Sequence, residues 1–199
     1  MIRFVFFDVG GVLGTAGPEI KTQFVREIGI SLDDYYAFQE RFINRVDTGK
    51  MTRDVFFQML NEAFHLGRGD LETVWGTIFE RTYREFPQTR EWAMKLKTKY
   101  GVGILSNVSP LTLVLHQEKK AYTGFEPWVF LSCEMGFGKP DPRVFNYINQ
   151  KTKTKSNECV LIDDREEHVI GARNSGWRAI HHITLEQTQK EFEKIVHEK

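Results

Sequence analysis

MIRFVFFDVGGVL (residues 1–13) joins a short apolar run, Ile2–Phe7, to an acid and a pair of glycines, Gly10 and Gly11. An aspartate interrupts the apolar stretch and no small-residue cleavage site follows it, so the segment does not resemble a secretory leader. The pattern predicts a buried strand that ends at Asp8. A glycine turn directly after such a strand lets the carboxylate project and lets a ligand approach the backbone closely.

The rest of the chain alternates short apolar runs with amphipathic stretches, which is typical of a parallel sheet flanked by helices. The expected strands are Ile2–Phe7, Val102–Leu105, Val129–Ser132, Cys159–Ile162 and Ala179–His182. The expected helices are Glu91–Lys99, Leu111–Lys119, Pro142–Lys151, Glu167–Ser175 and Leu185–Val196. We therefore predict the α/β class, with a Rossmann-like core of three layers around a parallel sheet.

One long interval breaks this alternation. Between Leu13 and about Gln88 only helical periodicity occurs, with breaks near Gly29, Gly49 and Gly67–Gly69. Asp33 and Thr52 are plausible helix starts in this interval. We interpret residues 14–88 as a small helical cap inserted into a core made of residues 1–13 and 89–199.

Composition narrows the possible partners. Lysine plus arginine total 27, and aspartate plus glutamate also total 27, so the formal net charge is zero. The chain therefore has no net positive charge that would attract nucleic acid or an anionic membrane. No apolar run has the length of a membrane helix. Cys133 and Cys159 lack a metal-ligand spacing and are expected to be reduced thiols of a cytoplasmic protein. We expect a monomer or a homodimer, with pairing through exposed cap aromatics such as Tyr35, Tyr36 and Phe38.

Polar residues follow the predicted strands in four places. They are Asp8, Ser106 with Asn107, Lys139, and Asp163 with Asp164. Open parallel sheets bind ligands at the carboxyl ends of their strands, so these groups are expected to meet in one crevice. Each alone could be a helix cap, a turn residue or a surface lysine. Their order along the chain favours a shared site.

Four segments carry a family resemblance: FFDVGGVL, ILSNVSP, GKPDP and LIDDREEHVIGA. With them, the chain resembles the haloacid dehalogenase-like (HAD) hydrolase superfamily over nearly all of its length. The inserted helices resemble the first cap class of that superfamily. The segment DTGKMTRDVFF is similar to the branch that includes glucose-1-phosphate phosphatase-like proteins and the amino-terminal domain of epoxide hydrolases.

The resemblance implies phosphoryl transfer to Asp8, which needs a nucleophile, a hard cation and fixed donors. Mg²⁺ prefers oxygen ligands, here Asp8, the backbone carbonyl of Gly10 and Asp164. Asp163 is either another ligand or a residue that orients Lys139 or a metal-bound water. The hydroxyl of Ser106 and the amide of Asn107 would donate hydrogen bonds to the phosphoryl oxygens. Lys139 would neutralise the negative charge that Asp8 and the phosphate share. Asp141 and Pro142 are expected to cap the helix behind the Lys139 loop.

Gly10 departs from the superfamily pattern, in which a second aspartate usually stands two residues after the nucleophile as general acid and base. The glucose-1-phosphate phosphatase-like branch also tolerates glycine there, so activity is not excluded. His168 is a second departure, and either hydrogen-bonds a metal-bound water or is a neutral histidine near a helix end.

Three functions stay open. The first is magnesium-dependent hydrolysis of a small phosphate ester, such as a sugar phosphate. The second is a catalytically weak binding or regulatory protein. The third is a haloacid dehalogenase, which the acidic pair Asp163 and Asp164 disfavours. Substrate choice is expected from cap residues, with four candidates in one turn: Arg41, Arg45, Asp47 and Lys50.

Overall fold

The computed structural model describes residues 1–15 and 17–197. Within this part of the chain, five strands form a parallel sheet in the order β3-β2-β1-β4-β5. The strands are β1 (Phe4–Phe7), β2 (Gly101–Ser106), β3 (Val129–Leu131), β4 (Cys159–Asp163) and β5 (Arg178–His181). All five predicted strands are thus confirmed, and β1 is the central one.

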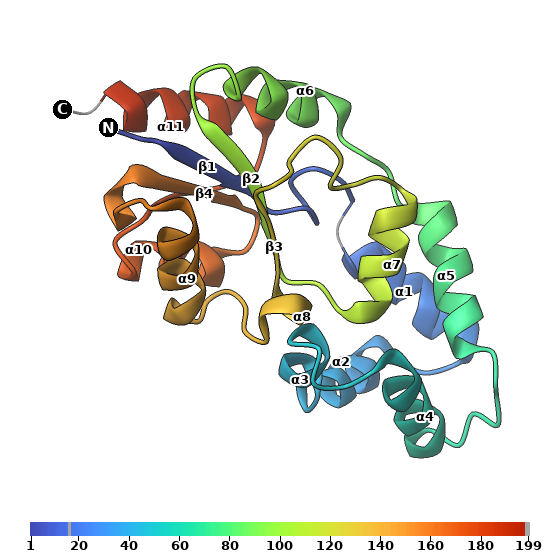
Figure 1. Cartoon of the computed structure of the whole chain (residues 1–199). Helices are drawn as coiled ribbons and strands as arrows, with labels where there is room; N and C mark the ends of the chain where they lie inside the picture. The colour runs from blue at the N-terminus through green and yellow to red at the C-terminus, as the bar shows by residue number, and fades with distance from the viewer. Residues whose placement is uncertain (16, 198–199) are drawn as a thin grey trace.

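Helices cover both faces of the sheet (Figure 1), and the side chains of β1 point alternately to one face and to the other. Val5 and Phe7 pack with α6 (Pro87–Leu96) and α11 (Leu185–His197) on one side. Phe4 and Phe6 pack with α9 (Pro142–Thr152) and α10 (Glu166–Asn174) on the other. Successive side chains of a strand point to opposite faces, so a strand buried on both faces reads as a continuous apolar run. The predicted three layers are confirmed.

The helices between β1 and α6 form a body with its own core. They are α1 (Gly17–Ile28), α2 (Leu32–Glu40), α3 (Ile43–Asp47), α4 (Arg53–Ala63) and α5 (Leu71–Thr82). Tyr35 and Phe38 are buried in this core, 1% and 6% exposed. The expectation that they are exposed was therefore wrong, because the aromatic face of α2 is needed to pack against α1 and α4. Tyr36, at 37%, is exposed.

Local signals explain where the cap helices begin and end. Thr52 caps α4 by accepting from the backbone N–H of Val55 at 3.4 Å, as its sequence position predicts. α2 starts earlier than the predicted Asp33, because Ser31 is the cap residue and accepts from the N–H of Asp34 at 3.0 Å. Gly29 follows the end of α1 with a left-handed φ of 78°.

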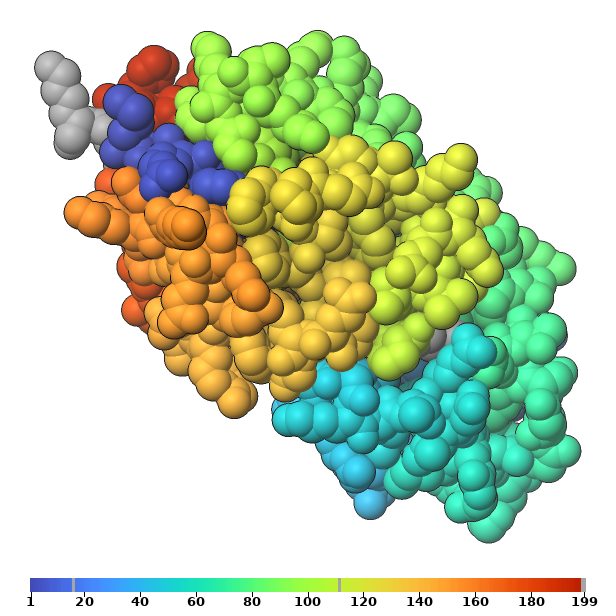
Figure 2. All heavy atoms as spheres, in the orientation of Figure 1, coloured from blue at the N-terminus to red at the C-terminus, as the bar shows by residue number. Residues whose placement is uncertain are grey.

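Two further elements bear on the site. α7 (Pro110–Glu118) follows β2, and α8 (Ser132–Met135) follows β3 as one helical turn that the periodicity did not reveal. Figure 2 shows the cap packed against this side of the core, with a depression where α7 meets the cap. Cys133 and Cys159 are free thiols. No helix in residues 1–15 and 17–197 is long and apolar enough to cross a bilayer.

Candidate active site

The carboxyl ends of the central strands bring together the acidic residues that the sequence singled out. Asp8 follows β1, and Asp163 and Asp164 lie at the end of β4. One carboxylate oxygen from each of the three lies within 4.8 Å of the others. Asp8 and Asp163 are buried and Asp164 is half-buried. So much negative charge in a small, partly desolvated volume requires compensation by cations.

Lys139 provides one of those cations. Its ammonium group donates to Asp8 Oδ1 at 3.0 Å and to the carbonyl of Leu105 at 2.6 Å, and it also contacts the carboxylate of Asp163. At 3% exposed it is not a surface lysine. Burial alone would lower the pKa of Lys139, but the two carboxylates raise it above the usual value. The side chain therefore stays charged and holds Asp8 in place.

Asp163 is fully engaged by protein groups. Besides Lys139, it contacts Nδ1 of His168 at 3.0 Å and accepts from the backbone N–H of Arg165 at 3.0 Å. Although burial acts in the opposite direction, Lys139 and His168 hold the pKa of Asp163 well below its usual range. The structure thus places His168 against a carboxylate. This contact favours a supporting role for Asp163, the orientation of Lys139.

Asp164 differs from its neighbour, since among the described residues no other residue donates a hydrogen bond to its carboxylate. Burial, together with Asp8 and Asp163, raises the pKa of Asp164 to about 6. Gly11 lies against this group, has a φ of 78°, and an added Cβ would come within 2.2 Å of Asp164 Oδ2. Only glycine therefore fits beside Asp164 in this turn. A carboxylate that no other residue binds and that its acidic neighbours repel suits a divalent cation.

The end of β2 supplies uncharged groups. Ser106 is 2% exposed and lines the cavity described below, and its hydroxyl has no partner among the described residues. It does not cap the next helix, because Ser109 does so by accepting from the N–H of Thr112 at 3.2 Å. The hydroxyl of Ser106 is thus available as a donor to a ligand.

Asn107 makes contacts that the sequence reasoning missed. Its side chain donates to the carbonyl of Lys139 at 2.7 Å and accepts from the N–H of Lys139 at 2.9 Å. The other end of the Lys139 loop is fixed as predicted, since Asp141 caps α9 by accepting from the N–H of Arg143 at 2.9 Å, with Pro142 at the first turn. Lys139 is therefore held at both ends of its loop. An asparagine directly after a strand end was the only available signal.

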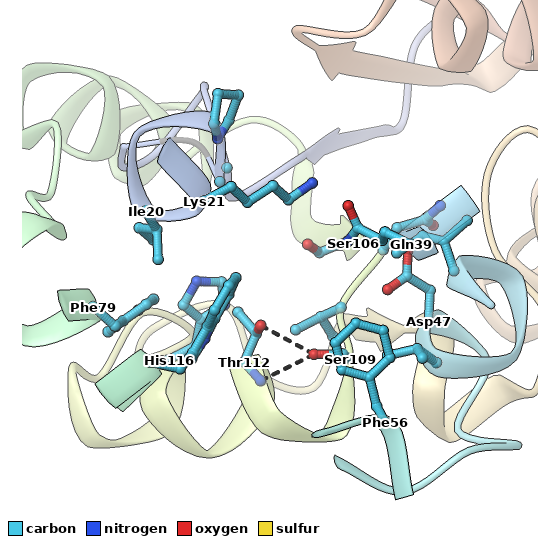
Figure 3. Close-up of a pocket in the computed structure, with 18 of the residues that line it drawn as sticks. Ile20, Lys21, Gln39, Asp47, Phe56, Phe79, Ser106, Ser109, Thr112 and His116 are labelled. Carbon is cyan, nitrogen blue, oxygen red and sulfur yellow. Dashed lines mark hydrogen bonds between the residues drawn. The ribbon is translucent and has the colours of Figure 1, made fainter. Parts of the chain in front are cut away.

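A cavity of about 620 Å³ is lined by Asp8 and by residues of the cap. Figure 3 shows part of this lining. Its core end is formed by Asp8, Ser106 and Asp164, and its cap end by a mainly apolar wall. The members of that wall include Ile20, Tyr35, Phe56, Phe57, Trp75 and Phe79. Of the four cap candidates from the sequence, Asp47 lines the cavity and the other three do not belong to its lining.

Comparison with known proteins gives a consistent family. The model of the haloacid dehalogenase-like hydrolase family matches residues 2–176. The chain is similar to a D-ribitol-5-phosphate phosphatase of Bacteroides thetaiotaomicron, 23% identical, with 89% of this chain and 90% of the relative covered. It is also similar to a sesquiterpene phosphatase of Aspergillus oryzae, 24% identical, with 98% and 96% covered.

Among solved structures, the chain resembles a HAD family enzyme of Bacteroides thetaiotaomicron in complex with magnesium and inorganic phosphate. The two share 22% identity over 90% of this chain and 93% of the other, with a TM-score of 0.71. At this identity the similarity establishes the fold.

Proposed function

Because the chain belongs to the haloacid dehalogenase-like hydrolases, we propose that it is a magnesium-dependent phosphohydrolase that forms an aspartyl-phosphate on Asp8. One observation carries the proposal. The Asp8 carboxylate stands at the end of the central strand, is held by the Lys139 ammonium group at 3.0 Å, and opens into a cavity under the cap. An ester phosphate at this position meets a fixed nucleophile and fixed positive charge.

The residues around Asp8 have separable tasks in this mechanism. Asp8 attacks phosphorus, and Lys139 offsets the negative charge that the carboxylate and the phosphoryl group share. The Ser106 hydroxyl and the backbone amide of Asn107 donate hydrogen bonds to the phosphoryl oxygens. Asp163 acts indirectly, by keeping Lys139 oriented and charged.

The donor set fits Mg²⁺, which binds carboxylate and carbonyl oxygens and keeps several waters. Asp8, Asp164 and the backbone carbonyl of Gly10 would hold the ion, with Asp163 beside them. When bound, the ion supplies positive charge that stabilises the transferring phosphoryl group. Magnesium in the similar solved structure and the phosphatase relatives support this assignment.

Hydrolysis of p-nitrophenyl phosphate tests the proposal against its two alternatives. A magnesium-dependent phosphatase should release p-nitrophenol with added Mg²⁺ and lose this activity in excess chelator. A dehalogenase would release halide from a 2-haloacid in the chelator, and a binding protein would do neither. Activity that is unchanged by the chelator would contradict the proposed metal site.

Asp164→Ala is expected to weaken magnesium binding more than it affects the fold. Its carboxylate has no protein partner to lose, and its removal relieves repulsion with Asp8 and Asp163. We expect a loss of activity on the order of 10²-fold at low Mg²⁺ that recovers partly at high Mg²⁺. Titration of activity with Mg²⁺ checks this, with Asp54→Asn, an exposed acid of the cap, as the control. An unaltered magnesium dependence would rule out Asp164 as a ligand.

The shape of the cavity bears on the substrate. Its cap wall is mainly apolar and rich in aromatic side chains. Burial of an apolar group stabilises a complex by about 25 cal/mol per Å² before the costs of binding. We therefore propose an ester with an apolar portion, in preference to a free sugar phosphate.

A panel of phosphate esters tests this preference. We expect kcat/KM for prenyl and aryl monophosphates to exceed that for ribitol-5-phosphate and hexose phosphates by about tenfold or more, equivalent to about 1.4 kcal/mol of extra apolar burial. A higher kcat/KM for the polyol phosphates would favour a sugar phosphate substrate.

A further inference from the structure

The site lacks an obvious proton donor, because position 10 is glycine. The leaving oxygen of an alkyl ester needs a proton, and the water that later attacks an aspartyl-phosphate must lose one. Any replacement must line the cavity next to Asp8. Arg53 and Arg165 line the cavity, but an arginine does not release its proton in proteins. His116 also lines it, but burial lowers the pKa of His116 to about 4, so this imidazole is neutral near pH 7 and has no proton of this kind to give.

We propose that Asp47, from the cap, is the general acid and base of this site and replaces the side chain that is absent at position 10. This inference rests on the phosphohydrolase function proposed above. Asp47 is the last residue of α3 and lines the same cavity as Asp8 and Ser106. Figure 3 shows its carboxyl group at the Ser106 end of the cavity, with the Lys21 side chain extended toward the same end.

Asp47 belongs to the cap, but the core fixes its position. The hydroxyl of Ser132, the first residue of α8, donates to the backbone carbonyl of Asp47 at 2.5 Å and accepts from the N–H of Val108 at 2.9 Å. Two residues later, Gly49 lies so close to the carbonyl of Cys133 that an added Cβ would come within 2.4 Å. The turn after α3 is thus attached to the strand ends that also hold the phosphoryl site.

The surroundings of Asp47 suit proton transfer. Its carboxyl group is half-buried and has no hydrogen-bond partner among the described residues. Burial raises the pKa of Asp47 to about 6, against the opposing effect of Lys21 and Arg165. Tyr35 and Cys133, both protonated near neutral pH, also lie near it. Near pH 6 the group is therefore divided between its acid and base forms.

The proton balance closes over the two steps. As Asp8 attacks phosphorus, the ester P–O bond breaks with its electron pair on the leaving oxygen, which takes the proton of the Asp47 carboxyl group. Water then attacks the aspartyl-phosphate and gives its proton to the Asp47 carboxylate. The bond to Asp8 breaks, and inorganic phosphate, free Asp8 and protonated Asp47 result.

Asp47→Asn is the decisive variant, because it is nearly isosteric and cannot exchange the proton. We expect kcat/KM for n-butyl phosphate to fall by about 10² to 10⁴-fold, while phosphoenzyme formation from p-nitrophenyl phosphate changes less than about threefold. The decline of kcat/KM for the butyl ester above pH 6 should disappear from the pH profile. Asp47→Glu should retain part of the alkyl activity, and Asp54→Asn, the exposed control, should behave as wild type.

Rapid-quench measurement separates the two steps and the two hypotheses. In Asp47→Asn, p-nitrophenyl phosphate should give a burst close to one equivalent of phenol per site, followed by slow hydrolysis of the intermediate. If Asp47→Asn lowers kcat/KM for n-butyl phosphate and phosphoenzyme formation from p-nitrophenyl phosphate by the same factor, or leaves the pH profile unchanged, the role of Asp47 is overturned. The phosphatase function would remain intact. Absence of magnesium-dependent hydrolysis in wild type overturns the phosphatase function itself.

Discussion

Asp8→Asn should lower phosphatase activity by at least about 10⁴-fold, because it removes the carboxylate that forms the covalent intermediate and one metal ligand. The side chain is nearly isosteric, so the cavity keeps its shape. Burial raises the pKa of Asp8 even though Lys139 opposes it, so burial disfavours the ionised form of Asp8. We therefore expect the variant to be as stable as wild type or more so.

The measurement has two parts. Steady-state hydrolysis of p-nitrophenyl phosphate gives the loss of activity, and thermal unfolding followed by near-UV circular dichroism gives the fold. Asp8→Glu is the matched control, since it keeps the charge but moves the carboxylate by one methylene; it should also be nearly inactive. Wild-type activity in Asp8→Asn would refute the covalent mechanism and would require water to attack phosphorus directly.

Most of the core was predictable because its signals are local. β1 and β4 are buried on both faces and read as continuous apolar runs, and Thr52 and Pro142 mark helix starts by their own chemistry. α8 was missed because four residues are too short to show a helical period. The burial of Tyr35 was missed for a different reason. Which face of a cap helix is covered depends on the partner helices, and sequence alone does not orient them.

The spatial grouping of the candidate site residues was predictable from the sequence, but their contacts with one another were not. Strand-end position was enough to group Asp8, Lys139, Asp163 and Asp164, because parallel strands end at one edge. It did not separate the two adjacent acids, whose tasks depend on which carboxylate meets Lys139 and which stays without a partner. The pairing of Asn107 with the Lys139 loop joins residues 32 apart in sequence, and no local pattern encodes it.

Lys139→Met should be the most destabilising change in the site. Methionine fills a similar volume but leaves Asp8 and Asp163 buried without their shared cation. Removal of one partner from a buried ion pair typically costs about 3 to 5 kcal/mol of unfolding free energy. Activity should fall by at least about 10³-fold, because positive charge at the phosphoryl group is lost as well. Urea unfolding at pH 7.5 and p-nitrophenyl phosphate hydrolysis measure the two effects.

The pH dependence and the metal dependence of this loss identify its cause. In wild type the pKa of Asp163 is held low, so its ion pair stabilises the fold above the unfolded-state pKa of about 4, and this contribution is lost as pH falls through the folded value. The loss of unfolding free energy in Lys139→Met relative to wild type should therefore be largest near neutral pH and should become smaller below about pH 4. Mg²⁺ at the same carboxylates should restore part of the stability at pH 7.5, and less so when Asp164→Ala is added. A deficit that is independent of pH and of Mg²⁺ would mean that Lys139 stabilises the fold through the packing of its aliphatic chain.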